Sequence, residues 1–283
     1  MVIVSHLHNQ PREDFVMATR MKWPKSLLFV RHDVSAYNKL RKEREKDPFY
    51  QDFMQLFKSE PTSNETRLVA LEVNRRFALG VSDAETPLIQ VESPLAIETG
   101  RKLREQEFRE QEELPDVIFV SPYLRARQTL AALIVGWPEL ASVKKVYEEE
   151  RIREQSHGLS GLYNDWRVFQ ALHPEQRLLY DQEGQYWYQW PQGESVSDVR
   201  ERVRSWMTTF IRDFAGQRIL AVSHHLTLLA LRANLERWDA NEFMRVDQHE
   251  KPVNCGVTKY VGIDGVGSNG WFKLDYYNQQ LAA

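Results

Sequence analysis

The sequence predicts an α/β fold in which a mostly parallel central sheet is covered by helices on both faces, giving a three-layer sandwich. Short apolar runs rich in β-branched residues occur at residues 27–30, 117–120 and 219–222, each bounded by turn or cap signals. Amphipathic helical patterns alternate with these runs. The chain has 283 residues, which is enough to bury a full core, and it contains no internal repeat.

Each expected element has a local reason. The Ser-Pro pairs at 93–94 and 121–122 place a capping serine before a proline at the first helical position. Residues 198–214 form the clearest helix, because their apolar side chains recur on one face and Ser195 and Asp198 have the spacing of a capping box. The glycine-rich residues 262–270 precede a strand pattern rather than a helix, which indicates a hairpin connection.

Composition excludes several classes of protein. A formal net charge of -3 argues against a dedicated nucleic-acid binder, which needs a basic face. The single cysteine, Cys255, rules out an intrachain disulfide and a thiolate zinc site, and it favours a reducing compartment. The apolar stretches are too short to cross a bilayer, and no leader pattern opens the chain. We therefore expect a cytoplasmic protein without membrane or nucleic-acid partners.

We expect one domain over residues 26–283, preceded by an N-terminal extension over 1–25 and carrying a helical insert at about 40–90. The insert has a helical pattern at 65–79 and contains Arg67, Arg75 and Arg76, which could meet a second anionic group or lie in an ordinary covering layer. Residues 166–190 are dense in aromatics. Such density is more typical of core than of a pocket wall, although both interpretations stay open.

Cationic side chains follow the three predicted strands. Arg31 and His32 come after the first strand, Arg125 lies in the first helical turn after the second, and His224 follows the third. Ligands of parallel sheets bind beyond the carboxyl ends of the strands, so we expect these residues to converge. Arginine forks and helix amino termini suit a phosphate dianion, and a neutral imidazole beside them can attack phosphorus.

Six segments, in order, resemble the histidine phosphatase superfamily, also called phosphoglycerate mutase-like. RHDVSAYN at 31–38 is similar to the family signature R-H-G-x-S-x-x-N, and VSHH at 222–225 is similar to V-S-H-G. The four segments between them are SPLAIETGR at 93–101, SPYLRARQT at 121–129, REQSHG at 153–158 and GES at 193–195. Any one of these matches would be weak evidence, but the ordered set is strong.

The resemblance implies a phosphoglycerate mutase-like fold and a role for each matched residue. His32 is implied to be the nucleophile that forms a phosphohistidine, and Glu154 to protonate the leaving oxygen and then to take a proton from water. The groups implied to hold the phosphoryl oxygens are Arg31, Asn38, Arg125 and His224. No metal or other cofactor is required, because the arginines and histidines supply the positive charge.

Two positions depart from the family pattern, because Asp33 and His225 stand where glycines are usual. Asp33 is either an additional acid near the substrate or, as we favour, a helix-capping residue that points away from phosphate. We expect His225 to turn away from His224 and to pack behind the pocket. Adjacent histidines seldom chelate one ion, which argues against a zinc site at this pair.

The sequence favours a phosphomonoester hydrolase acting on a small phosphorylated metabolite. The alternatives are a cofactor-dependent phosphoglycerate mutase and a non-catalytic protein that binds a phosphorylated ligand. True mutases of the family carry E-R-H-Y-G where this chain has EQSHG at 154–158, which favours the hydrolase. The presence of His32, Glu154 and His224 counts against the non-catalytic alternative. The sequence leaves the oligomeric state open, a homodimer included.

Overall fold

The computed structural model describes residues 22–90, 93–110, 113–266 and 270–282. The extension expected over residues 1–25 therefore lies mostly outside the described residues.

A six-stranded sheet forms the centre of the molecule, with the strand order β3-β2-β4-β1-β5-β6. β1, β2, β3 and β4 run parallel, whereas β5 lies antiparallel to β1 and to β6. This confirms the expected mostly parallel sheet and the hairpin near the C-terminus. The strands are β1 (Ser26–Arg31), β2 (Val117–Val120), β3 (Lys145–Glu148), β4 (Arg218–Ser223), β5 (Val257–Ile263) and β6 (Trp271–Gln279).

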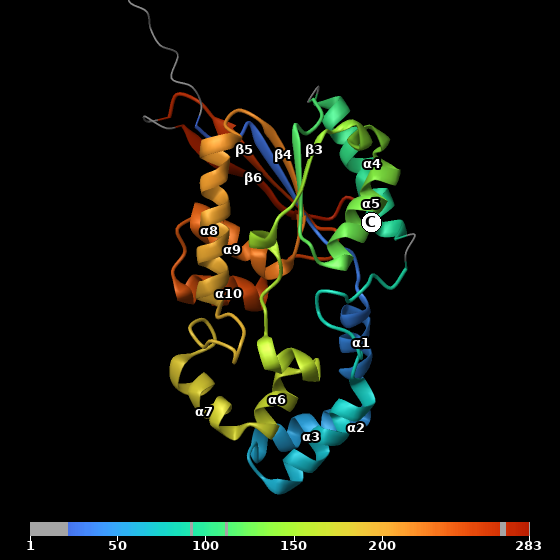
Figure 1. The fold of residues 1–283 in the computed structure, drawn as a ribbon, viewed down its shortest axis with the longest axis vertical. Helices are drawn as coiled ribbons and strands as arrows, with labels where there is room; N and C mark the ends of the chain where they lie inside the picture. The colour runs from blue at the N-terminus through green and yellow to red at the C-terminus, as the bar shows by residue number, and fades with distance from the viewer. Residues whose placement is uncertain (1–21, 91–92, 111–112, 267–269, 283) are drawn as a thin grey trace, which may run out of the picture.

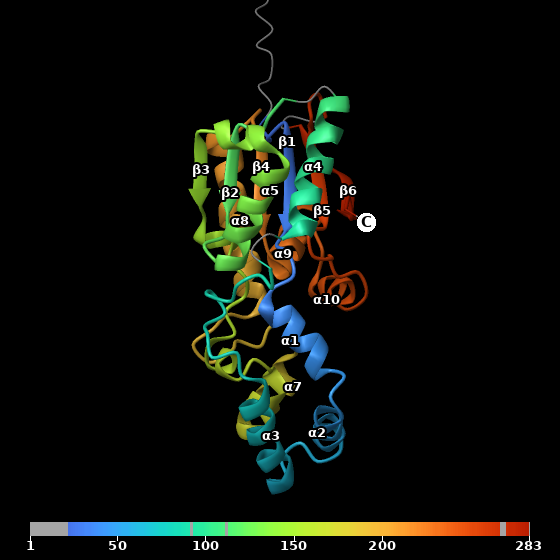
Figure 2. The same cartoon turned by 90° about the vertical axis from the view of Figure 1, so that its right-hand side faces the viewer.

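Helices cover both faces of the sheet, as Figure 2 shows. The side chains of β1 alternate between the two faces: Leu27 and Phe29 pack with α8 (Val196–Asp213), α9 (His225–Leu235) and α10 (Ala240–His249), whereas Leu28 and Val30 pack with α4 (Pro94–Arg109) and α5 (Leu124–Gly136). The three-layer arrangement is therefore confirmed. Within the described parts of the chain, no helix combines the length and the apolarity that a membrane crossing needs.

A helical lobe lies beyond one end of the sheet (Figures 1 and 2). Its helices are α1 (Ala36–Arg44), α2 (Pro48–Ser59), α3 (Asn64–Phe77), α6 (Trp166–Leu172) and α7 (Pro174–Glu183). Phe53 and Phe57 of α2 and Val73 of α3 share a small core with Val168 and Ala171 of α6. Segments about a hundred residues apart in sequence thus form one lobe over the carboxyl ends of the parallel strands.

Three short 3-10 helices complete the described secondary structure of the connections: η1 (Pro138–Ser142), η2 (Glu150–Ile152) and η3 (Gly158–Tyr163). The last two bracket the REQSHG segment, which descends from the sheet toward the lobe. β3, at the edge of the sheet, was not expected from the sequence. All four of its residues are exposed, so it lacks the apolar run that marks the buried strands.

Candidate functional site

A pocket of about 680 Å³ lies between the carboxyl ends of the parallel strands and the helical lobe. Five of the six residues expected at the site line it, and His224 lies immediately behind them with its ring centroid 5.1 Å from that of His32. The five lining residues are Arg31, His32, Asn38, Arg125 and Glu154. The structure thus brings together the residues that the sequence placed on separate strands.

His32 is held as a neutral imidazole with a defined tautomer. It is buried, and its Nδ1 lies 2.6 Å from the carbonyl oxygen of Asp33. A carbonyl only accepts, so Nδ1 carries the proton and Nε2 keeps its lone pair. Burial, followed by the charges of Arg125 and Arg31, lowers the pKa of His32 well below its usual value. The neutral ring is the form that can act as a nucleophile.

His224 is fixed behind His32 by one hydrogen bond and one ring contact. Its Nε2 lies 2.7 Å from the Ser121 hydroxyl, and its ring meets the edge of Tyr123 with 5.1 Å between the centroids. Burial, followed by the charge of Arg125, lowers the pKa of His224 well below its usual value. Sequence analysis noted Ser121 only as a cap signal, yet its hydroxyl orients this ring.

Two buried nitrogen atoms beside the pocket have neither a hydrogen bond nor an ion pair among the described residues: Nε of Arg31 and Nδ1 of His224. Arg31 is otherwise tethered by its Nη1, which donates to the carbonyl oxygen of Pro252 at 2.5 Å. Buried polar atoms are rarely left without a partner, so these two indicate a place for an acceptor-rich ligand. A phosphoryl group, with three peripheral oxygens, meets that need.

Asn38 presents its amide group to the pocket. Its Oδ1 accepts from the backbone N–H of Ser35 and from Nδ2 of Asn254, both at 3.2 Å. These contacts orient the side chain and leave its NH₂ as the end suited to a ligand oxygen. Asn254, on the segment before β5, also donates to the carbonyl oxygen of His32 at 2.9 Å. It lies outside every motif and was not found by sequence analysis.

Glu154 is positioned by an ion-pair network beneath its loop. Glu194 of the GES segment accepts from Arg153 at 2.6 Å and from Arg202 of α8 at 2.8 Å. Arg202 also donates to the backbone carbonyl of Glu154 at 3.1 Å. The GES segment therefore supports the acid-bearing loop rather than touching a ligand itself.

Glycines let this loop approach its neighbours closely. Gly158 has a φ of +50°, and a Cβ placed there would lie 2.1 Å from the carbonyl oxygen of Pro191. A Cβ at Gly193 would lie 2.5 Å from the carbonyl oxygen of Ser156. Only glycine fits these contacts, which explains the two glycines of the REQSHG and GES segments.

Arg125 carries a partner that the sequence did not predict. Its guanidinium is buried, and its central carbon lies 5.0 Å from the centroid of the Tyr123 ring. The guanidinium also forms an ion pair with Asp83, from the loop between α3 and α4. The Nη1–Oδ1 distance is 3.0 Å. Asp83 belongs to no motif, so only the path of its loop reveals this contact.

The two departures from the family pattern take different positions. Asp33 does not cap a helix as expected, because Ser35 caps α1. The Asp33 carboxylate accepts instead from the backbone N–H of Val34 at 2.6 Å and from the hydroxyl of Ser93. His225 was expected behind the pocket, but it lines the pocket wall, and its Nε2 lies 2.8 Å from Oδ1 of Asp247. As the first residue of α9, it faces α10 across the pocket edge.

The outer part of the pocket is formed largely by the lobe. Tyr37 of α1, Leu162 of η3 and Trp166 of α6 line it together with residues of the loop between α3 and α4. Most other aromatics of the 166–190 segment are core, because Phe169, Tyr188 and Trp190 pack together. Arg67, Arg75 and Arg76 of the expected insert do not line the pocket.

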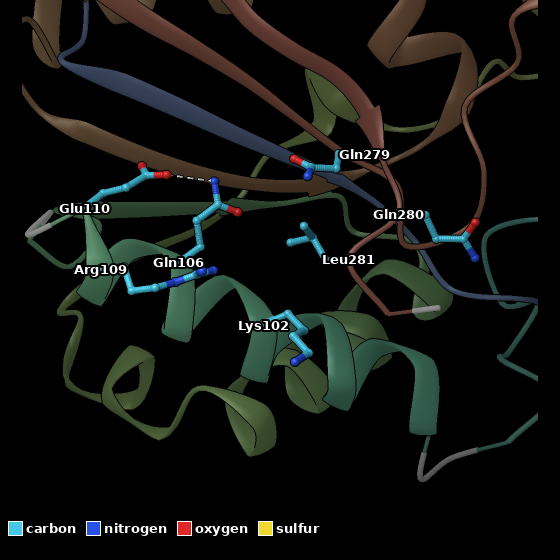
Figure 3. A pocket seen from close by; sticks show the side chains of 7 residues that line it. All are labelled: Lys102, Gln106, Arg109, Glu110, Gln279, Gln280 and Leu281. Carbon is cyan, nitrogen blue, oxygen red and sulfur yellow. Dashed lines mark hydrogen bonds between the residues drawn. The ribbon is translucent and has the colours of Figure 1, made fainter.

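A second cavity, of about 590 Å³, lies between α4 and the end of β6 (Figure 3). It is lined by Lys102, Gln106, Arg109, Glu110 and residues 279–281. Gln106 donates to Glu110 at 3.0 Å across this wall. None of the motif residues lines it. In the described part of the chain, no cluster of three or more histidine, cysteine or acidic side chains has an arrangement that could hold a metal ion.

Comparison with known sequences assigns the family. A sequence model of the histidine phosphatase superfamily (branch 1) matches residues 89–267. The chain belongs to this superfamily. The matched range contains Arg125, Glu154 and His224, whereas Arg31, His32 and Asn38 precede it. The fold and the resemblance expected from the sequence are thereby confirmed.

Relatives and solved structures agree with this assignment. The phosphoglycerate mutase-like protein AT74H of Arabidopsis thaliana is 31% identical over 180 residues, which cover 58% of this chain and 61% of the relative. The chain thus matches about three-fifths of that relative's length. A mycobacterial glucosyl-3-phosphoglycerate phosphatase with inorganic phosphate has a TM-score of 0.57 at 18% identity, with 92% of this chain and 99% of that chain covered. YhfR of Bacillus stearothermophilus has a TM-score of 0.58 at 17% identity, with 90% and 98% covered. These two solved structures share the fold of this chain.

Proposed function

We propose that the protein is a metal-independent phosphomonoester hydrolase that acts through a phosphohistidine on a small phosphorylated metabolite. The observation that carries the proposal is the state of His32, a buried neutral imidazole whose Nδ1 is engaged by the Asp33 carbonyl. Its Nε2 is therefore the nitrogen with an available lone pair, in a pocket lined by three arginines and a glutamic acid.

In the first step, Nε2 of His32 attacks phosphorus, the N–P bond forms and the ester P–O bond breaks. Glu154 gives its proton to the departing oxygen. In the second step, Glu154 takes a proton from water, whose oxygen attacks phosphorus, and the N–P bond breaks. Inorganic phosphate leaves, and His32 is regenerated.

Arg31, Arg125 and Asn38 hold the phosphoryl oxygens during both steps, together with His224. The guanidinium charges offset the negative charge on the transferring group, which is the contribution that a metal makes in other phosphoryl-transfer sites. The vacant bonding positions on Arg31 Nε and His224 Nδ1 support this assignment.

The leaving group fills the outer pocket. A volume of about 680 Å³ exceeds what a phosphoryl group alone occupies, and Tyr37, Leu162 and Trp166 give the outer part an apolar wall. Two lobe cations near the pocket, Arg44 and Arg167, pair with Asp165. Arg41 of α1 lines the pocket itself, and its partner is the exposed Glu45, at 2.8 Å. We therefore assign the substrate an organic part of appreciable size.

The test is phosphate release from a panel of phosphomonoesters in excess chelator, comparing the wild-type protein with His32→Ala. We expect release that survives chelation, is greater for aryl or nucleoside monophosphates than for glycerol phosphate, and vanishes in His32→Ala. No release from any ester, or release that needs an added divalent metal, would overturn the proposal.

Mutase activity is a second candidate, because the curated relative is described as phosphoglycerate mutase-like. In this chain the positions that carry arginine and histidine in mutases are Gln155 and Ser156. Gln155 is buried and donates to the backbone carbonyl of Glu194 at 2.8 Å, so it supports the loop and offers no cation to a carboxylate. We expect no interconversion of 2- and 3-phosphoglycerate in a coupled assay, and rapid interconversion would favour the mutase.

A further inference from the structure

An acidic side chain of the protein pairs with one of the arginines that the proposed function assigns to phosphate. Asp83 engages both terminal nitrogens of Arg125: Nη1 lies 3.0 Å from Oδ1, and Nη2 donates to Oδ2 at 3.3 Å. The backbone carbonyl of Asp83 accepts from Nη1 at 2.5 Å. A carboxylate that spans both nitrogens uses the same fork of donors that would bind two phosphoryl oxygens.

The loop that carries Asp83 is anchored on its C-terminal side. The backbone N–H of Leu124, at the start of α5, donates to the carbonyl oxygen of Ala84 at 2.8 Å. Two residues earlier in the loop, the carbonyl oxygen of Ser82 accepts from the Thr86 hydroxyl at 3.0 Å. The first bond ties the backbone beside Asp83 to the start of the helix that bears Arg125, and the second stabilises the turn that contains Asp83.

The two partners differ in their exposure. The Arg125 side chain is 5% exposed, whereas that of Asp83 is 43% exposed. Rotation of the Asp83 side chain into water would release the fork at small desolvation cost, while Arg125 stays in place. The guanidinium, once released, needs another acceptor because it is buried.

We propose that Asp83 is a specificity-determining residue that competes with the phosphoryl group for Arg125. The inference rests on the proposed function, since it assumes that Arg125 binds the phosphoryl group. An ester whose organic part fills the outer pocket gains contacts that offset displacement of Asp83. Inorganic phosphate has no such organic part, so it binds weakly. After hydrolysis the Asp83 carboxylate pairs with Arg125 again, which favours release of the phosphate product.

The experiment measures binding of inorganic phosphate, as a probe, to the full chain by calorimetry, and its inhibition of ester hydrolysis. The variants are Asp83→Asn and Asp83→Ala, both of which keep the backbone carbonyl on Arg125. Glu85→Gln is the matched control: it removes the same charge from an exposed position in the same loop that does not line the pocket. Arg125→Ala and Arg125→Lys test the site itself.

We expect both Asp83 variants to bind phosphate on the order of tenfold more tightly than the wild-type protein, a difference of about 1.4 kcal/mol. Glu85→Gln should bind as the wild type does. In an Arg125→Lys background, Asp83→Asn should give a much smaller gain, because the fork for which the two anions compete is gone.

The proposal is overturned if both Asp83 variants bind phosphate no more tightly than the wild type, or if Glu85→Gln tightens binding equally. It is also overturned if Asp83→Asn loses turnover at unchanged phosphate affinity, which would make Asp83 a proton donor. In all three cases weakened phosphate binding in the Arg125 variants would leave the proposed function standing. If the folded Arg125 variants bind phosphate and turn over esters as the wild type does, the proposed function itself fails.

Discussion

In the proposed mechanism, catalysis depends on the orientation of the His32 and His224 rings. His32 is fixed by a backbone carbonyl, and His224 is fixed by the hydroxyl of Ser121. Sequence analysis could identify both histidines because each follows a buried strand, where the chain turns toward the ligand edge of the sheet. It could not identify Asp83, because nothing in the pattern of residues 79–90 specifies how that loop crosses the start of α5.

Ser121→Ala tests the positioning of His224. Removal of the hydroxyl leaves Nε2 of a buried ring without its partner, so the ring should lose its fixed orientation toward the phosphoryl group. We expect kcat/KM to fall about tenfold, which corresponds to about 1.4 kcal/mol. Steady-state kinetics on the best ester of the panel, with thermal unfolding as a check of folding, measure this. Unchanged kcat/KM in the folded variant would show that the hydroxyl does not contribute.

Among the elements, the buried strands were predictable and the edge strand was not. β1, β2 and β4 are apolar along their whole length because helices cover both faces, whereas β3 lies at the edge with exposed side chains. The loop between η2 and η3 shows that contacts between segments distant in the sequence could not be predicted either. Gly158 was visible in the sequence, but the contacts that require a glycine there come from residues 191–193, over thirty positions away.

Gly158→Ala tests that loop. A methyl group there would clash with the carbonyl oxygen of Pro191 in a left-handed backbone conformation, and relief of the clash would move the segment that carries Glu154. We expect the free energy of unfolding to fall by about 2–4 kcal/mol, together with a loss of turnover. Gly161→Ala is the matched control, since nothing lies within 4 Å of its added Cβ. Equal stability of the two variants in urea unfolding would refute the assignment.

At the scale of the whole molecule, the helical lobe determines what the pocket accepts. A helical insert at about 40–90 was expected, and its pattern at 65–79 corresponds to α3. The packing of α2 and α3 against α6 was not expected, because α6 lies about a hundred residues further along the chain. Periodicity identifies each helix, while the partner of its apolar face depends on the tertiary fold. We retain the single domain over residues 26–283 as a proposal.

Stability should depend on pH mainly through His32 and His224, and to a smaller degree through His157, whose pKa is also lowered by burial. Their pKa values are lowered in the folded protein, mainly by burial, so below the unfolded value of about 6.5 the unfolded chain binds more protons than the folded one. The free energy of unfolding should therefore fall as the pH drops through 6.5, by at most about 1.4 kcal/mol per pH unit for each histidine.

Urea unfolding between about pH 7.5 and about pH 5.5 measures this slope. His32→Gln should make the slope shallower, because one of the contributing histidines is removed. His249→Gln, at an exposed position at the end of α10, should leave the slope unchanged. A slope that His32→Gln does not alter would contradict the assignment of a depressed pKa to His32.

Detection of the phosphorylated enzyme tests the central claim most directly. Glu154→Gln lacks the group that activates water. After rapid mixing with an aryl ester, whose leaving oxygen departs without a proton, and alkaline quenching, the variant should retain one phosphoryl group, seen as an intact-mass increase and mapped to His32. His32→Ala in the same background should show none. Phosphate release by the wild-type protein without any phosphoryl group on His32, or turnover that persists in His32→Ala, would contradict the mechanism.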